Sequence, residues 1–193
     1  MIIGITGGSG CGKTTVLQVL ESLSVLTLDC DAIYHRLLRE DPALLDSIEA
    51  RFPGTVEQNK LQRKKLGDLV FSDPEAVEDL NRITHGAVKK EVLRLLSAHK
   101  GHAAIDAIGL FEGELAQLCD CTVAVLAPRE DRVQRLMARD GITREYAEKR
   151  IDAQHSDAWF RERCTYVLEN SGNLDAFATN CLAFFRSMGI MEL

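Results

Sequence analysis

The chain has 193 residues, of which 46% are hydrophobic and 27% are charged, as is usual for one folded domain with a sizeable core. The formal net charge of −6 argues against a general nucleic-acid binder. Its six cysteines form no CxxC pair, which favours reduced thiols over a disulfide framework or a zinc site. With no basic leader and no apolar run of about 18 residues, the sequence predicts a cytoplasmic protein without membrane partners. A monomer or weak homo-oligomer is expected.

Apolar runs alternate with helical patterns along the chain. The five runs that predict buried strands are residues 2–5, 25–28, 103–108, 122–126 and 166–168. Amphipathic helices are expected at 13–23 and 175–188. Two longer stretches, 32–98 and 129–163, show no obvious strand and read as several helices each, broken at Pro and Gly positions. The pattern predicts an α/β fold with a five-stranded parallel sheet in three layers, carrying a helical substrate-binding cap (32–98) and a lid (129–163).

The segment after the first strand is a complete phosphate-binding motif. Residues Gly7-Gly8-Ser9-Gly10-Cys11-Gly12-Lys13-Thr14 match G-x-x-x-x-G-K-[ST], with a strand before them and a helix after them. Glycines let consecutive N–H groups point into one concavity, and the helix N-terminus adds its positive dipole end. We therefore expect Lys13 to reach the β- and γ-phosphates of ATP and the Thr14 hydroxyl to coordinate Mg²⁺. For Cys11, a small tolerated side chain is favoured over a redox switch.

Two carboxylates, Asp29 and Asp31, follow the second predicted strand. On an extended segment, residues i and i+2 share one face, so both would face the same side. One of them could accept a proton from a hydroxyl that attacks the γ-phosphate. From the motif and this carboxylate alone, the sequence predicts a nucleotide-dependent phosphoryl transfer to a small molecule.

Motifs spread over about 165 residues resemble the dephospho-CoA kinase family of P-loop kinases. The opening, Ile5 to Thr15, resembles the family's GLTGGIGSGKST, and Asp29-Cys30-Asp31 resembles its D-A-D. The other segments that carry the resemblance are Leu61-Gln62-Arg63 with Leu66-Gly67 and Val70-Phe71, Leu80 to His85, Asp106 with Leu110-Phe111-Glu112, Gln134-Arg135-Leu136, Arg139-Asp140, Ala147, Arg150-Ile151, Gln154 and Glu169 to Gly172.

The resemblance implies phosphorylation of the ribose 3′-hydroxyl of dephospho-CoA, the last step of CoA synthesis, with Mg²⁺ and ATP. It makes Asp31 the proposed base and substrate ligand, with Lys13 and the lid's Arg139 also catalytic. The residues implied to bind ATP are Gly8, Ser9, Gly10, Cys11, Gly12, Lys13, Thr14, Thr15 and, bordering the adenine, Asn170; those implied to bind the acceptor are Arg63, His85 and Glu112.

Some residues depart from the family pattern, and other interpretations stay open. Gln62 replaces an Asp, Gly86 a Pro and Glu169 an Asp, and no Pro precedes Leu110. Arg63 and His85 have structural alternatives as a solvated helix face and a satisfied core histidine, while Asp106 fits a structural or a metal-related role. The rival functions are a kinase for another small molecule, a homologue that binds CoA without turnover, and a GTPase-type switch, for which no N-K-x-D motif exists.

Overall fold

The computed structural model describes residues 1–70 and 73–191, so Phe71 of the V-F motif lies outside the described residues. The chain forms two compact units. The first consists of Met1–Leu28 and Lys100–Leu193, and the second is Asp29–His99. Among the described helices, none is both long and apolar enough to cross a membrane.

The first unit contains a five-stranded parallel sheet. Its strands are β1 (Ile2–Thr6), β2 (Leu26–Asp29), β5 (Ala103–Asp106), β6 (Cys121–Leu126) and β7 (Tyr166–Glu169), in the order β2-β5-β1-β6-β7. The central β1 pairs with β5 on one side, Ile5 opposite Asp106, and with β6 on the other, Thr6 opposite Ala124. All five predicted strands are therefore confirmed. The third one ends two residues earlier than expected, at Asp106.

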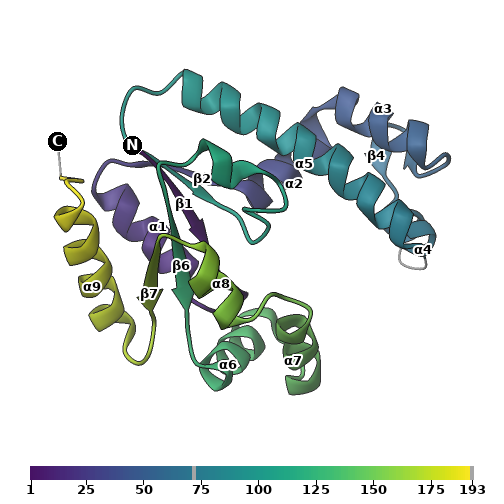
Figure 1. Ribbon diagram of the computed structural model, residues 1–193. Helices are drawn as coiled ribbons and strands as arrows, with labels where there is room; N and C mark the ends of the chain where they lie inside the picture. Colours follow the sequence, from purple (N-terminus) through teal and green to yellow (C-terminus); the bar gives the residue numbers. More distant parts are fainter. Residues whose placement is uncertain (71–72, 192–193) are drawn as a thin grey trace. The chain divides into compact units, whose positions relative to one another are not determined.

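Helices cover the sheet on both faces, because alternate residues of each buried strand point to opposite sides. Helices α1 (Lys13–Ser22) and α9 (Leu174–Ser187) lie against each other and pack on Ile3, Ile5, Val123 and Val125. On the other face, Phe160 of α8 (Asp157–Arg163) packs on the intervening β6 residues. Figure 1 shows these helices around the strands of the first unit. The expected three-layer α/β architecture is confirmed.

The predicted lid region consists of three helices. Helix α6 (Arg129–Asp140) ends at Gly141, whose left-handed backbone (φ 64°) allows the chain to turn into α7 (Arg144–Asp152). The two helices share an apolar cluster that includes Val133, Leu136, Ala147 and Ile151. Helix α8 follows, and a short 3₁₀ helix, η1 (Leu115–Leu118), precedes β6.

The second unit is mostly helical. Its helices are α2 (Cys30–Glu40), α3 (Pro42–Arg51), α4 (Arg63–Val70) and α5 (Pro74–Ser97). Asp41 and Asp73 cap α3 and α5, and a proline follows each in the first turn, as the sequence breaks predicted. The prediction missed a small antiparallel hairpin, β3 (Val56–Glu57) with β4 (Lys60–Leu61). Its two-residue turn, Gln58-Asn59, has positive φ at both positions without a glycine, so the usual hairpin signal is absent.

Candidate phosphate-binding site

The predicted phosphate loop connects β1 to α1 through a backbone that needs glycine at several points. Gly7, Gly10 and Gly12 have φ values of 136°, 81° and 102°, which side-chain-bearing residues rarely adopt. Space is equally limiting: a Cβ atom at Gly7 would lie 2.2 Å from the carbonyl oxygen of Val125, and one at Gly12 would lie 2.3 Å from Nδ2 of Asn170. The loop is therefore packed tightly against β6 and the residue that follows β7.

Every carbonyl from Gly7 to Gly12 accepts a hydrogen bond from elsewhere in the first unit. The donors, in order along the loop, are Lys13 Nζ (2.9 Å), the N–H of Cys11 (3.3 Å), Arg132 Nε (3.0 Å), an Arg135 guanidinium nitrogen (3.1 Å), Asn170 Nδ2 (2.9 Å) and the N–H of Thr15 (3.1 Å). In a trans peptide the N–H points away from the preceding C=O. Side chains from outside the loop hold the Ser9, Gly10 and Cys11 carbonyls, which turns the N–H groups of the same peptides the other way, as an anion-binding concavity requires.

The start of α1 completes this concavity. Within the described residues, no side chain caps the first turn of α1, so its N–H groups and positive dipole end are available to an anion. Thr14 is exposed, and Lys13 and Thr15 are half-buried. Cys11 is fully buried, and burial raises the pKa of its thiol, which agrees with the prediction of a packing role rather than a redox switch.

Asp29 and Asp31 differ from the predicted arrangement. Asp29 is the N-cap of α2, and its carboxylate accepts the N–H of Ala32 at 2.9 Å. Asp31 consequently lies in the first turn of a helix, with an exposed side chain, and does not share an extended face with Asp29. The expectation that both carboxylates share one face of an extended segment was wrong, because the capping interaction begins the helix at Cys30.

Asp106 supplies a carboxylate at the carboxyl end of β5. It is opposite Ile5, next to the start of the phosphate loop, and its Oδ1 atom is buried. The Thr14 hydroxyl and this carboxylate are oxygen donors of the kind that Mg²⁺ prefers, at the edge of the sheet where ligands bind in parallel α/β folds. No cluster of three or more His, Cys, Asp or Glu side chains that could hold a metal ion occurs in the described residues.

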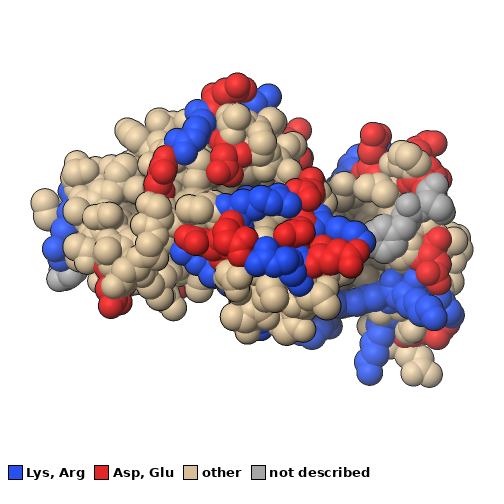
Figure 2. All heavy atoms as spheres, turned by 90° about the horizontal axis from the view of Figure 1, so that it is seen from below, with Lys and Arg blue, Asp and Glu red and all other residues tan. Residues whose placement is uncertain are grey.

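Arg139 lies apart from the loop. Its guanidinium binds the neighbouring Asp140 through two hydrogen bonds of 2.7 and 3.0 Å, and Arg150 binds the same carboxylate. On the face shown in Figure 2, Lys and Arg side chains lie beside Asp and Glu side chains in the middle of the view. Arg135, of the Gln134-Arg135-Leu136 motif on the same helix, contacts the loop directly through Gly10.

Glu112 is exposed beyond the end of β5 and is linked to the segment after α7. Its Oε1 is 2.5 Å from Nε2 of His155. The His155 ring stacks on Trp159 at a centroid distance of 3.8 Å and an angle of 4°. The guanidinium of Arg163 lies over the same indole at 4.4 Å. Glu112 therefore ties the loop after β5 to the start of α8, an arrangement that sequence motifs did not indicate.

The second unit has its own cavity, of about 330 Å³. Apolar side chains form most of its wall, and Arg63, Tyr34 and His35 add polar groups. Arg63 lies 3.4 Å from Nδ1 of His35, and burial raises the pKa of Tyr34. His85 is half-buried on α5 and does not appear among the described residues that line this cavity. A guanidinium beside an apolar wall suits a ligand with a phosphate group and an uncharged arm.

Two residues of the site escaped sequence reasoning as functional candidates. Arg132 is 5% exposed beneath the loop, and Gln154, quoted only as a motif position, bonds to Ser9. The signal that could have found Arg132 is its spacing from Arg135: residues i and i+3 of one helix share a face. A cation on a helix face that also carries apolar residues needs a buried partner, here the loop.

Comparisons with known proteins agree with this geometry. A family model described as dephospho-CoA kinase matches residues 1–176. Dephospho-CoA kinases of Deinococcus radiodurans and Thermus thermophilus are each 39% identical, over 97% and 91% of this chain and 92% and 85% of theirs. The chain belongs to the dephospho-CoA kinase family.

Solved structures give the same result for the fold. The crystal structure of a Thermus thermophilus protein is similar with a TM-score of 0.82 and 36% identity over 97% of both chains. Dephospho-CoA kinase from Campylobacter jejuni has a TM-score of 0.70 at 23% identity, covering 97% of this chain and 96% of its own. A shikimate kinase from Acinetobacter baumannii, at 0.57 and 20%, covers 97% of this chain and 93% of its own and shares the P-loop kinase fold.

Proposed function

We propose that this chain transfers the γ-phosphoryl group of ATP to the ribose 3′-hydroxyl of dephospho-CoA. Its membership of the dephospho-CoA kinase family supports the acceptor. The observation that supports the nucleotide is the loop itself, in which every carbonyl from Gly7 to Gly12 accepts a hydrogen bond. The N–H groups of Ser9 and Cys11 donate within the protein, so those of Gly10, Gly12 and Lys13 are the ones proposed to bind the oxygens of a triphosphate.

ATP is bound by the loop residues Gly8 to Thr15. Lys13 exchanges the Gly7 carbonyl, its partner at 2.9 Å, for the β- and γ-phosphates, where a fixed cation stabilises the charge of the transferring group. Asn170 is fully buried and bonds to the Cys11 carbonyl. These contacts support a role for Asn170 in shaping the loop beside the nucleotide.

Magnesium fits the oxygen donors of this site. The Thr14 hydroxyl and the Asp106 carboxylate would hold the ion, directly or through water. When bound, it neutralises charge on the β- and γ-phosphate oxygens. Asp106 places its carboxylate at the carboxyl end of β5, and Thr14 places its hydroxyl in the first turn of α1.

Asp31 orients the acceptor hydroxyl and takes its proton. The supporting observation is that Asp31 comes two residues after the end of β2, since ligands bind beyond the carboxyl ends of such strands. Arg63, His85 and Glu112 bind the acceptor, with Arg63 matching a phosphate group bidentately. Arg139 leaves Asp140 to stabilise the transferring phosphoryl group. Most of the rate enhancement then comes from positioning and electrostatics.

A panel of acceptors with Mg·ATP tests the proposed function. Dephospho-CoA, nucleosides, nucleoside monophosphates, shikimate and gluconate are offered at equal concentration, and the product phosphate is located by ³¹P NMR. We expect 3′-phosphorylation of dephospho-CoA alone. Transfer to another acceptor, or binding of dephospho-CoA without turnover, would refute the proposal.

Asp31→Asn tests the assignment of the base. The variant keeps the shape of the side chain but cannot accept the proton, so kcat should fall by roughly 10²-fold or more while ATP affinity is unchanged. Asp46→Asn, on the exposed surface of α3 in the same unit, is the matched control and should keep wild-type kcat. Wild-type turnover by Asp31→Asn would exclude Asp31 as the base.

A further inference from the structure

Ser9 of the phosphate loop is held on three sides by side chains from the lid region. Its N–H donates to Oε1 of Gln154 at 2.9 Å, and its hydroxyl accepts from Nε2 of the same amide at 2.8 Å. Its carbonyl accepts from Nε of Arg132 at 3.0 Å. Ser9 is only 6% exposed, so these contacts replace water at each of its polar groups.

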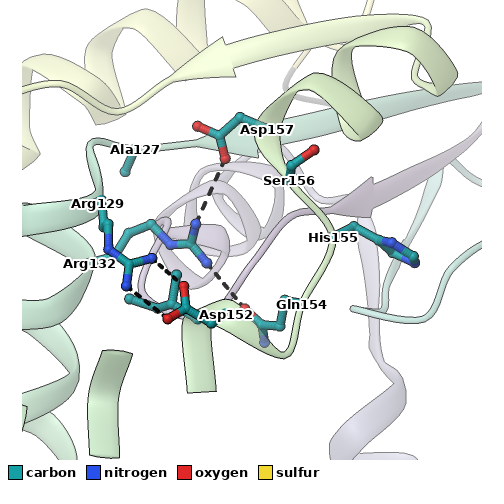
Figure 3. Close-up of a pocket in the computed structure, with 9 residues that line it drawn as sticks. Ala127, Arg129, Arg132, Asp152, Gln154, His155, Ser156 and Asp157 are labelled. Carbon is teal, nitrogen blue, oxygen red and sulfur yellow. Dashed lines mark hydrogen bonds and ion pairs between the residues drawn. The ribbon is translucent and has the colours of Figure 1, made fainter. Parts of the chain in front are cut away.

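Arg132 and Gln154 also fix each other. A second guanidinium nitrogen of Arg132 donates to Oε1 of Gln154 at 3.1 Å, and a third lies 3.7 Å from Asp157 (Figure 3). Oε1 thus faces two donors, which leaves Nε2 directed at the Ser9 hydroxyl and gives the amide one orientation. The Arg132 side chain is 6% exposed, and a guanidinium so buried requires these partners.

The adjacent glycines are shaped to this cluster. A Cβ atom at Gly8 would lie 2.1 Å from the Arg132 guanidinium and 2.9 Å from Oε1 of Gln154. One at Gly10 would lie 2.9 Å from the carbonyl oxygen of Arg132. Gly8 does not have a positive φ, so close approach to the cluster, rather than backbone conformation, explains its glycine.

The contact to the Ser9 carbonyl sets the direction of the next N–H. Ser9 C=O and Gly10 N–H belong to one trans peptide and point in opposite directions. With the carbonyl bound to Arg132, the Gly10 N–H is turned to the opposite side, into the concavity of the loop. Arg132 stands near the start of α6, and Gln154 follows α7, so two separate segments of the lid both contact Ser9.

We propose that Gln154 and Arg132 are positioning residues of the ATP site, which hold Ser9 so that the Gly10 N–H faces the triphosphate. They act through the loop and touch neither the acceptor nor the reacting atoms. This inference rests on the proposed function only in that the loop binds ATP. The identity of the acceptor does not enter it.

Equilibrium binding of ATP to Gln154→Ala, measured by calorimetry without acceptor, tests the proposal. We expect the Kd for ATP to rise by about 5- to 30-fold, as for loss of one or two hydrogen bonds at a fixed group. Arg132→Lys keeps the charge but not the fork that spans Ser9 and Gln154, and should weaken ATP binding similarly. Ser9→Ala removes only the hydroxyl contact and should have the smallest effect.

Gln134→Ala is the matched control. Gln134 is an exposed glutamine on α6 whose amide bonds to Glu130 at 2.9 Å, away from the loop. It should leave the Kd for ATP unchanged. In steady-state assays Gln154→Ala should raise KM for ATP and leave KM for the acceptor at its wild-type value.

Two results would overturn the proposal. One is wild-type ATP affinity in both Gln154→Ala and Arg132→Lys. The other is a fall in ATP affinity and Tm together with a rise in the acceptor KM in every variant, which would indicate a general structural role. Failure of the wild type to phosphorylate dephospho-CoA would refute the proposed acceptor but would leave this binding comparison intact.

Discussion

The arginines of α6 divide into two kinds by the partner of the guanidinium. Arg132 and Arg135 donate to backbone carbonyls of the loop and have longer ion-pair contacts, of 3.7 and 4.0 Å, with Asp157 and Asp131. Arg129 and Arg139 instead each bind a carboxylate through two hydrogen bonds. Arg129 precedes Arg132 by three residues and Arg139 follows Arg135 by four, so the difference lies in the partner and not in opposite faces of the helix.

This difference shows that the partner, rather than the number of arginines, decides the local electrostatics. A guanidinium that donates to neutral carbonyls keeps its positive charge available to a bound triphosphate. A guanidinium paired with a carboxylate contributes little net charge, and an exposed pair contributes little to stability. Arg132 and Arg135 therefore keep cationic groups against the loop, whereas the proposed role of Arg139 requires it to leave Asp140.

Among the arginines of α6, Arg139→Ala should have the largest effect. If Arg139 stabilises the transferring group, kcat falls by about 10- to 100-fold. In the structure Arg139 contacts Asp140 in a surface ion pair, so the loss of this contact should leave ATP affinity and Tm near wild type. Pre-steady-state and calorimetric measurements separate the two quantities, with Arg129→Ala as the control that keeps kcat. A wild-type kcat for Arg139→Ala would place Arg139 with Arg129 as a surface residue.

Arg135→Ala should have a different signature. It removes the donor to the Gly10 carbonyl (3.1 Å) and a cation from the loop-facing side, and both losses act in the nucleotide complex. We expect ATP affinity to fall by about 10-fold, as for one charge-assisted hydrogen bond. The loss should shrink at high salt if the charge dominates. A loss in kcat alone would mean that Arg135 belongs with Arg139.

The second unit extends the comparison to a carboxylate. Glu91, whose side chain is 11% exposed, binds Arg94 and Arg36, which lower its pKa to about 2. Because the pKa of folded Glu91 is lower than its unfolded value of about 4.5, the ionised side chain stabilises the fold fully above pH 4.5. This stabilisation is lost as the pH falls toward 2.

Glu91→Gln should accordingly lower the free energy of unfolding by about 1 kcal/mol at pH 7 and by much less near pH 2. Denaturant titrations at both pH values provide the measurement. Glu145→Gln is the control, because its pair with Lys149 is 79% and 71% exposed, and it should change stability at neither pH. Equal effects of the two substitutions would show that burial of Glu91 adds nothing.

The sequence predicted the sheet and the loop because both depend on local patterns. Short β-branched runs that alternate with helical patterns indicate the buried strands of a parallel sheet. The glycines and Lys13 of the loop are specified by the backbone geometry that binds phosphate. Caps such as Asp41 and Asp73, each followed by proline, marked the helix starts in the second unit.

Other features depend on contacts between distant residues and could not be predicted. Gln154 meets Ser9 across 145 positions and Arg132 meets it across 123, and neither residue type has a local signature for such a contact. The helix at Cys30 arose from a cap by Asp29, which competed with the extended arrangement that the two-residue spacing suggested. The Gln58-Asn59 hairpin lacks the glycine on which turn recognition relies.

The stack of His155 on Trp159 gives the protein an intrinsic optical reporter. Trp159 is the only tryptophan of the chain, and its ring contacts the imidazole of His155 and the guanidinium of Arg163. Its emission depends on whether those neighbours stay in place. Because His155 directly follows Gln154 and bonds to Glu112, indole fluorescence monitors, without a label, the attachment of the segment between α7 and α8 to the rest of the first unit.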